Sequence, residues 1–161
     1  MNTYRRHLDK FIVAGIAMVL SSALLISGCT SNDERQDIII KNASDYMNEG
    51  DYDKAIELLN EGLTLAEGRV GNREIDICYY KGAAQFNKGD YEGALKTYTS
   101  LINYDDETPY PYFLRGSVYL RTGEKTTALD DYKSAIKIAE DDYDLYIAIY
   151  ENLSSLNFVK E

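Results

Sequence analysis

Apolar and polar residues divide the chain into two unlike regions. Residues 11–26 form an almost continuous apolar run that follows a short basic segment. From about residue 36 onward, apolar residues recur at spacings of three and four, as they do in residues 145–156. This spacing is typical of amphipathic helices, because residues three and four apart share one helical face. The pattern therefore predicts a helical body behind an N-terminal segment of a different kind.

One short motif interrupts the helical region three times. It reads Gly-Asp-Tyr-Asp-Lys-Ala from Gly50, Gly-Asp-Tyr-Glu-Gly-Ala from Gly89 and Gly-Glu-Lys-Thr-Thr-Ala from Gly123. The first two glycines are 39 residues apart, and the last two are 34 apart. Glycine supplies the left-handed conformation in which many helices end, and the acidic residue after it favours the start of the next helix. A recurring period of this length indicates a stack of similar helical units.

The motif and its period resemble the tetratricopeptide repeat (TPR), a helix–turn–helix unit of about 34 residues. Placed on the glycines, the units cover residues 36–69, 75–108 and 109–142, with an insertion at 70–74. Residues 143–161 are then expected to form a C-terminal capping helix, or alternatively the beginning of a truncated fourth repeat. The resemblance implies an all-α fold, a right-handed α-solenoid of three TPR hairpins closed by this capping helix.

The resemblance also requires small side chains where paired helices touch. Eight of the nine such places hold Ala or Gly, and Leu101 is the exception. We expect Leu101 to open the packing of the second unit against the third slightly. Gln85 stands where the other two units have Tyr, and Cys78 takes the place of a large side chain. The small residues are Ala43, Ala55, Gly62, Gly82, Ala94, Gly116, Ala128 and Ala135.

The N-terminal run has the features of a bacterial lipoprotein signal peptide. It is shorter than the stretch of about 20 apolar residues that spans a bilayer, and it combines a basic head with small residues at its end. Leu25-Ile26-Ser27-Gly28-Cys29 resembles a lipobox. This resemblance implies that residues 1–28 are removed and that the thiol of Cys29 carries the lipid. An uncleaved signal anchor with an incidental cysteine is the alternative.

Residues 29–35 are polar after the cysteine, and they are predicted to be a lipidated tether. The expected location is therefore a bacterial cell membrane, with the chain lipid-anchored on the extracytoplasmic face. Two or three acyl chains would hold the protein there durably.

Composition narrows the classes of function. With 27 acidic and 17 basic residues, the net charge is −10, which disfavours nucleic acid because phosphate binding needs a basic face. One histidine, His7, and two cysteines are too few for a His/Cys metal site. Removal of the signal would also remove His7 and leave no imidazole base. We therefore predict no enzymatic activity, no cofactor, no metal and no nucleic-acid partner.

In TPR solenoids, the first helix of each unit lines a concave groove. The residues that the resemblance places there are mostly apolar or aromatic, with few of the cations that carboxylate-binding members use. An exposed row of this kind marks a partner site, unless the tether or the C-terminal tail folds over it. The predicted partner groove consists of Ile40, Met47, Tyr79, Phe86, Asn87, Phe113, Ser117, Leu120 and Arg121.

These observations predict a membrane-tethered TPR scaffold or adaptor in the bacterial cell envelope. It would bind a protein or peptide segment in its apolar concave groove, with hot spots at Tyr79, Phe86 and Phe113, and would contact the membrane through the lipid at Cys29. One alternative is a structural oligomer that stacks through the ends of the solenoid. A small-ligand receptor or a wall enzyme is less favoured, because the sequence shows no convergent set of polar groups.

Overall fold

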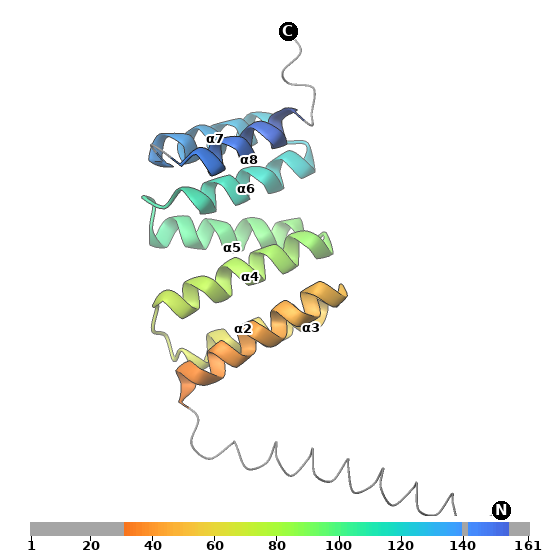
Figure 1. Ribbon diagram of the computed structural model, residues 1–161, viewed down its shortest axis with the longest axis vertical. Coiled ribbons are helices and arrows are strands. Elements are labelled where there is room, and N and C mark those ends of the chain that lie inside the picture. Colours follow the sequence, from red (N-terminus) through yellow and green to blue (C-terminus); the bar gives the residue numbers. More distant parts are fainter. Residues whose placement is uncertain (1–30, 140–141, 155–161) are drawn as a thin grey trace, which may run out of the picture. The chain divides into compact units, whose positions relative to one another are not determined.

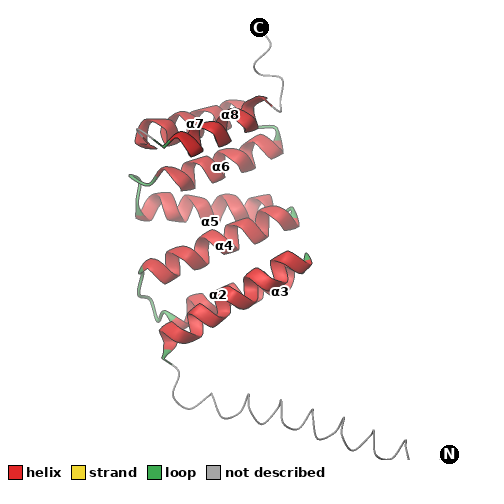
Figure 2. Cartoon of the chain, viewed as in Figure 1, coloured by secondary structure: helices red, strands yellow, loops and turns green. Residues whose placement is uncertain are grey.

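The computed structural model describes residues 31–139 and 142–154. In this part of the chain there are seven α-helices and no strand, so the all-α prediction is confirmed (Figure 2). The predicted signal peptide, Cys29 and residues 155–161 lie outside the described residues. The helices are α2 (Asn32–Glu49), α3 (Tyr52–Leu65), α4 (Asn72–Lys88), α5 (Tyr91–Tyr104), α6 (Pro109–Thr122), α7 (Lys125–Ala139) and α8 (Tyr143–Ser154).

The chain comprises two units, residues 1–35 and 36–161. In the second unit, the helices pack in the order in which they occur (Figure 1): α4 pairs with α5 and α6 with α7, while α3 contacts α4 and α5 contacts α6. Ala43 of α2 joins Ala55 and Leu59 of α3 in one buried cluster. Helix α8 contacts α6 and α7. The predicted solenoid of three hairpins and a terminal helix is therefore confirmed.

The recurring glycines end the first helix of each hairpin. Gly50, Gly89 and Gly123 have φ values of 80°, 88° and 89°, in the left-handed region that side chains with a Cβ disfavour. The aspartate that follows two of them caps the next helix. The Oδ1 atoms of Asp51 and Asp90 accept hydrogen bonds from the backbone N–H groups three residues later, at 3.2 and 3.0 Å. The motif thus encodes both the end of one helix and the start of another.

Within each hairpin, a small residue on the first helix faces a large one on the second. A Cβ added to Gly82 would lie 2.6 Å from Cζ of Tyr98, and one added to Gly116 would lie 2.8 Å from Cε1 of Tyr132. In the first unit, the corresponding places hold Ala43 and the smaller Leu59, both fully buried. Because the tyrosine rings lie directly on the glycines, the helices approach closely without strain. The small-residue framework therefore positions the faces of α2, α4 and α6.

Residues 32–35, which were predicted to belong to the tether, form the first turn of helix α2. The Oγ atom of Ser31 accepts a hydrogen bond from the N–H of Glu34 at 3.2 Å. In return, the Glu34 carboxylate accepts one from the N–H of Ser31 at 3.0 Å. This reciprocal capping box satisfies two free N–H groups at the helix start. The Ser-x-x-Glu motif could have predicted this helix start, but the segment was interpreted as a tether because it is polar throughout.

The predicted insertion at 70–74 is divided between a loop and a helix. Residues 66–71 connect α3 to α4, and residues 72–74 already belong to α4. Gly68 and Glu67 both have positive φ, 83° and 52°, which turns the chain sharply after α3. The Glu74 carboxylate accepts a hydrogen bond from the N–H of Gly71 at 2.8 Å and so fixes the start of α4. The extra residues therefore lengthen the first turn of α4 as well as the loop.

Two departures from the repeat have visible packing consequences. Leu101 is buried beside Val118. Gln85 is buried and accepts a 2.7 Å hydrogen bond from the Thr97 hydroxyl. Gly93 leaves room for it, since a Cβ there would lie 2.5 Å from Nε2 of Gln85.

Candidate functional site

The nine predicted groove residues lie on α2, α4 and α6, the first helices of the three hairpins, and we call this set the groove face. Asn87 and Arg121 are exposed, and the other seven are half-buried. Helical spacing explains the grouping, because residues seven apart lie on the same side of a helix. Tyr79 and Phe86 have this separation on α4, and Phe113 and Leu120 have it on α6. None of the nine is enclosed in the core.

The α4 part of the groove face is aromatic and partly used for packing. Tyr79 and Phe86 pack against the buried cluster around Ala94 and Tyr98. The Phe86 ring also meets the Tyr91 ring edge-on, with centroids 5.8 Å apart. Both side chains nevertheless remain half-buried. Each therefore has a supported orientation and an accessible part, which is the condition for a preorganised contact.

The α6 part is held by α7 and α8. The Phe113 ring lies 6.0 Å from the ring of Tyr132. The Ser117 hydroxyl donates to the carbonyl of Phe113 at 2.9 Å, lies 3.2 Å from the Tyr132 hydroxyl and accepts a 3.1 Å hydrogen bond from Nδ2 of Asn152. Ser117 therefore serves the docking of α8, while Phe113 and Leu120 supply the apolar part of this face.

The α2 part is apolar and lies against the first core cluster. Ile40 and Met47 are half-buried and pack on the residues around Ala43 and Leu59. A flexible methionine adapts to contacts of differing shape. The groove face thus continues onto the first hairpin with aliphatic in place of aromatic side chains.

Polar groups lie at both ends of the groove face. At the C-terminal ends of α4 and α6, Asn87 is exposed, and Nε of Arg121 donates to the Tyr91 hydroxyl at 3.3 Å. At the other end, burial raises the pKa of Tyr79, and the nearby negative charge of Asp105 adds to this effect. The groove face therefore has an apolar centre, with Arg121 at one end and the charge of Asp105 near Tyr79 at the other.

Helix α8 carries a second exposed apolar row that the sequence interpretation missed. The apolar spacing in residues 145–156 predicts one packing face, but within Tyr143–Ser154 only Leu145 and Ile149 are buried. Tyr143, Ile147 and Tyr150 are 78%, 56% and 60% exposed. Because α8 is apolar on two faces, the spacing of its apolar residues does not show which face packs against the repeats. The aromatic residues on both faces could have indicated that one of these faces is exposed.

The described residues contain neither a metal-binding cluster nor a membrane-spanning helix. No group of three or more His, Cys, Asp and Glu side chains in this part of the chain is placed to hold a metal ion. No helix within residues 31–139 or 142–154 is long and apolar enough to cross a membrane.

Comparison with known sequences identifies the repeats. Family profiles described as "TPR repeat" and "Tetratricopeptide repeat" match residues 82–123 and residues 45–69 and 110–142, respectively. The TPR repeat-containing protein MJ1428 of Methanocaldococcus jannaschii is 33% identical over 76 residues. This match covers 46% of the chain and 12% of that protein, so the chain spans a small part of its relative's length.

Solved structures share the fold at low sequence identity. PcrH in complex with the chaperone-binding region of PopB has a TM-score of 0.62 at 17% identity, covering 79% of this chain and 97% of PcrH. The C-terminal TPR-containing domain of an FK506-binding protein from Plasmodium falciparum has a TM-score of 0.59 at 13% identity, covering 80% of this chain and 94% of that domain. At these identities the likeness establishes the solenoid fold.

Proposed function

Since the chain is built of tetratricopeptide repeats, a scaffold suited to binding other proteins, we propose that it binds a protein or peptide segment along the groove face. One observation carries the proposal: the aromatic rings of Phe86 and Phe113 are oriented by packing yet remain half-buried on the first helices of two adjacent hairpins. The comparison with PcrH, whose structure contains a bound region of PopB, supports the same class of function.

The chemistry of the groove face indicates how a segment would be held. Tyr79, Phe86 and Phe113 offer apolar contact area with few rotatable bonds, which is typical of binding hot spots. Asn87 and Arg121 can donate hydrogen bonds to the backbone or to an acidic side chain of the segment. A segment with apolar anchors spaced along one side, helical or extended, fits this arrangement.

Truncation of the two phenylalanines tests the proposal. Phe86→Ala and Phe113→Ala should each weaken partner binding by about 2 kcal/mol or more, which is about thirtyfold in affinity. Stability should fall by less than the roughly 3–5 kcal/mol that a fully buried aromatic costs. The measurements are retention of envelope proteins by the immobilised chain and thermal unfolding. Tyr104→Ala, which removes an exposed ring on α5, is the matched control and should leave retention unchanged.

We further propose that Cys29 carries lipid and tethers the protein to the extracytoplasmic face of a bacterial membrane. The proposal rests on the sequence Ile26-Ser27-Gly28-Cys29 after a basic and apolar segment. Tethering would raise the effective concentration of the scaffold near membrane-bound partners without additional contacts.

Metabolic labelling with a radioactive fatty acid checks the anchor. Cys29→Ala should abolish labelling and leave a full-length precursor, because the thiol is the attachment site. Cys78→Ala is the control and should be labelled and processed normally. Labelled and processed Cys29→Ala protein would contradict the lipoprotein proposal.

A structural oligomer is the second candidate, and the exposed row on α8 favours it. Tyr143, Ile147 and Tyr150 form an apolar surface at the end of the stack, where a second copy could pack its own α8. Light scattering of the wild-type chain and of Tyr150→Lys separates the candidates. A dimer that Tyr150→Lys dissociates supports stacking, and a monomer in both samples excludes it.

A further inference from the structure

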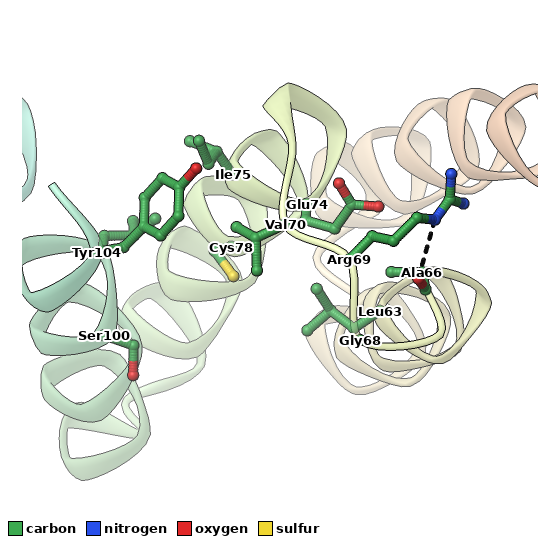
Figure 3. A pocket seen from close by; sticks show the side chains of 11 residues that line it. Leu63, Ala66, Gly68, Arg69, Val70, Glu74, Ile75, Cys78, Ser100 and Tyr104 are labelled. Carbon is green, nitrogen blue, oxygen red and sulfur yellow. Dashed lines mark hydrogen bonds between the residues drawn. The ribbon is translucent and has the colours of Figure 1, made fainter.

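A hollow lies between α3 and α5, with α4 as its floor (Figure 3). Its cavity measures about 250 Å³, and its walls are almost wholly apolar. Cys78 lies at the floor, and the more than half-exposed Val70 and Tyr104 stand at the edge. No residue of the groove face lines it. The apolar walls are formed chiefly by Leu63, Ala66, Val70, Ile75 and Leu101.

Two departures from the repeat account for this hollow. The extra residues between the first two units form the loop 66–71, which supplies Val70 as one wall. Cys78 occupies the place in its unit that Ile39 and Tyr112 occupy in theirs, so the volume of a large side chain is left unfilled. An open hollow with mostly apolar walls gains free energy when an apolar ligand covers these walls.

A second hollow of about 320 Å³ adjoins the first and shares Leu63, Cys78 and Ser100 with it. It extends between α4 and α5 to the side chains of Lys81 and Lys96. The two hollows together form one cleft, apolar at the end near the loop 66–71 and basic at the other. We call it the α3–α5 cleft.

Lys81 lacks the carboxylate partner that the equivalent residue of the third hairpin has. Arg115 occupies the same position in its unit, and its Nη2 and Nε atoms lie 2.7 and 2.8 Å from the Asp131 carboxylate. In the second unit the place of Asp131 is taken by Thr97, whose hydroxyl donates to Gln85. Among the described residues, the half-buried Lys81 makes no hydrogen bond or ion pair. Lys81 therefore remains available to pair with an anionic ligand at this point.

The other ionisable groups of the cleft fix the orientation of a ligand. Glu74 lines the apolar hollow, but its carboxylate is held at the rim by 2.8 Å hydrogen bonds from Nε2 of Gln36 and the N–H of Gly71. The hydrogen bond from Gln36 lowers the pKa of Glu74, and the positive charge of Arg69, which also lines this hollow, lowers it further. The two charges at this end therefore offset each other, whereas the lining of the second hollow contains Lys81 and Lys96 and no carboxylate. Burial raises the pKa of the Cys78 thiol, which keeps it neutral. An anionic head group therefore belongs at the Lys81 end.

We propose that the α3–α5 cleft binds a single-chain amphiphile with an alkyl tail and a carboxylate head, of the fatty-acid class. The tail fills the apolar hollow, and the head pairs with Lys81 and with the neighbouring Lys96. An alkyl chain suits these walls better than a peptide does, because a peptide would bury amide groups where few partners exist. This site is separate from the groove face, so it does not depend on the proposed partner.

Cys78 provides the readout for a direct test. The full chain, reconstituted in phosphatidylcholine nanodiscs, is alkylated with N-ethylmaleimide, and modification of the Cys78 peptide is followed by mass spectrometry. Decanoate, below its micelle-forming concentration, should slow alkylation of Cys78 about tenfold at saturation. Decyltrimethylammonium has the same tail with a positive head, and butyrate has the same head with a short tail. Neither should protect Cys78 at the same concentration.

Three variants assign the two ends of the cleft. Lys81→Gln should raise the half-protecting concentration of decanoate about tenfold, because it removes a charge-assisted bond. Val70→Asp, at an exposed loop position, should weaken protection similarly by placing a negative charge beside the tail. Lys133→Gln, an exposed lysine on α7, should match the wild type. Circular dichroism of each variant verifies that the helices are retained.

Several results would overturn the proposal. Absence of protection by decanoate would show that the cleft takes no alkyl carboxylate. Equal protection by decyltrimethylammonium, or an unchanged Lys81→Gln variant, would show that no head-group site exists. Loss of protection in Lys133→Gln would indicate a general effect of charge instead of a site.

Discussion

Tyr98 and Tyr132 are among the largest side chains that the fold buries. Each ring covers a glycine on the facing helix, and burial is the main cause that raises the pKa of both phenols. Ionising either one would place a phenolate inside a hairpin. The stability of this tyrosine-rich core is therefore linked to pH on the alkaline side.

The expected consequence is alkaline destabilisation. Because the folded-state pKa values are raised, the neutral phenols contribute their full stability below the ordinary tyrosine pKa of about 10. This contribution is lost as the pH rises toward the folded-state values. Melting temperatures should be nearly constant from pH 7 to 9 and fall above about pH 10. The fall should be shallower in Tyr98→Phe, and unchanged in Tyr143→Phe, which removes an exposed hydroxyl. Equal slopes in all three proteins would contradict this linkage.

At the scale of helices, the sequence predicted helix ends best at positions where the backbone conformation allows only one type of residue. Gly50, Gly89 and Gly123 mark helix ends because only a left-handed residue fits there, and their period located the hairpins. The start of α2 was missed because Ser31 and Glu34 sit in a segment that is otherwise polar. The extra turn of α4 was missed because an insertion relative to a repeat does not reveal whether it lengthens a loop or a helix.

The pairing of small and large residues between helices gives a prediction at this scale. Gly82→Ala should place a methyl group against Tyr98, and this overpacking should lower the free energy of unfolding by about 1–3 kcal/mol. The higher helix propensity of Ala should offset about 1 kcal/mol of this loss. Adding Tyr98→Leu reproduces the Ala43–Leu59 pair of the first unit. Chemical denaturation of the single and double variants measures the coupling.

The double variant should be more stable than the sum of the two single changes by about 1 kcal/mol or more. Simple additivity would mean that the ring and the added methyl group do not meet. Ala83→Gly, which changes the neighbouring residue on α4 to glycine, controls for helix propensity alone.

For the molecule as a whole, the repeat framework predicted which helices carry the groove face but not how much of each side chain is free. Phe86 and Phe113 were expected to project from the fold, and the structure leaves them half-buried against Tyr91 and Tyr132. The exposed row on α8 and the α3–α5 cleft were not predicted. Both features arise where the chain departs from the repeat. The sequence shows where such a departure occurs, but it does not show which surface or cavity results there.

We propose that a partner segment lies along the groove face, and site-specific photo-crosslinking in cells tests this proposal most directly. A photoreactive amino acid at Asn87, exposed beside Phe86, should capture a defined partner, and Phe113→Ala in the same chain should reduce that product strongly. The same probe at Lys133, exposed on α7, should not capture it. Capture from position 133 with equal yield, or capture from position 87 that is indifferent to Phe113→Ala, would contradict the account.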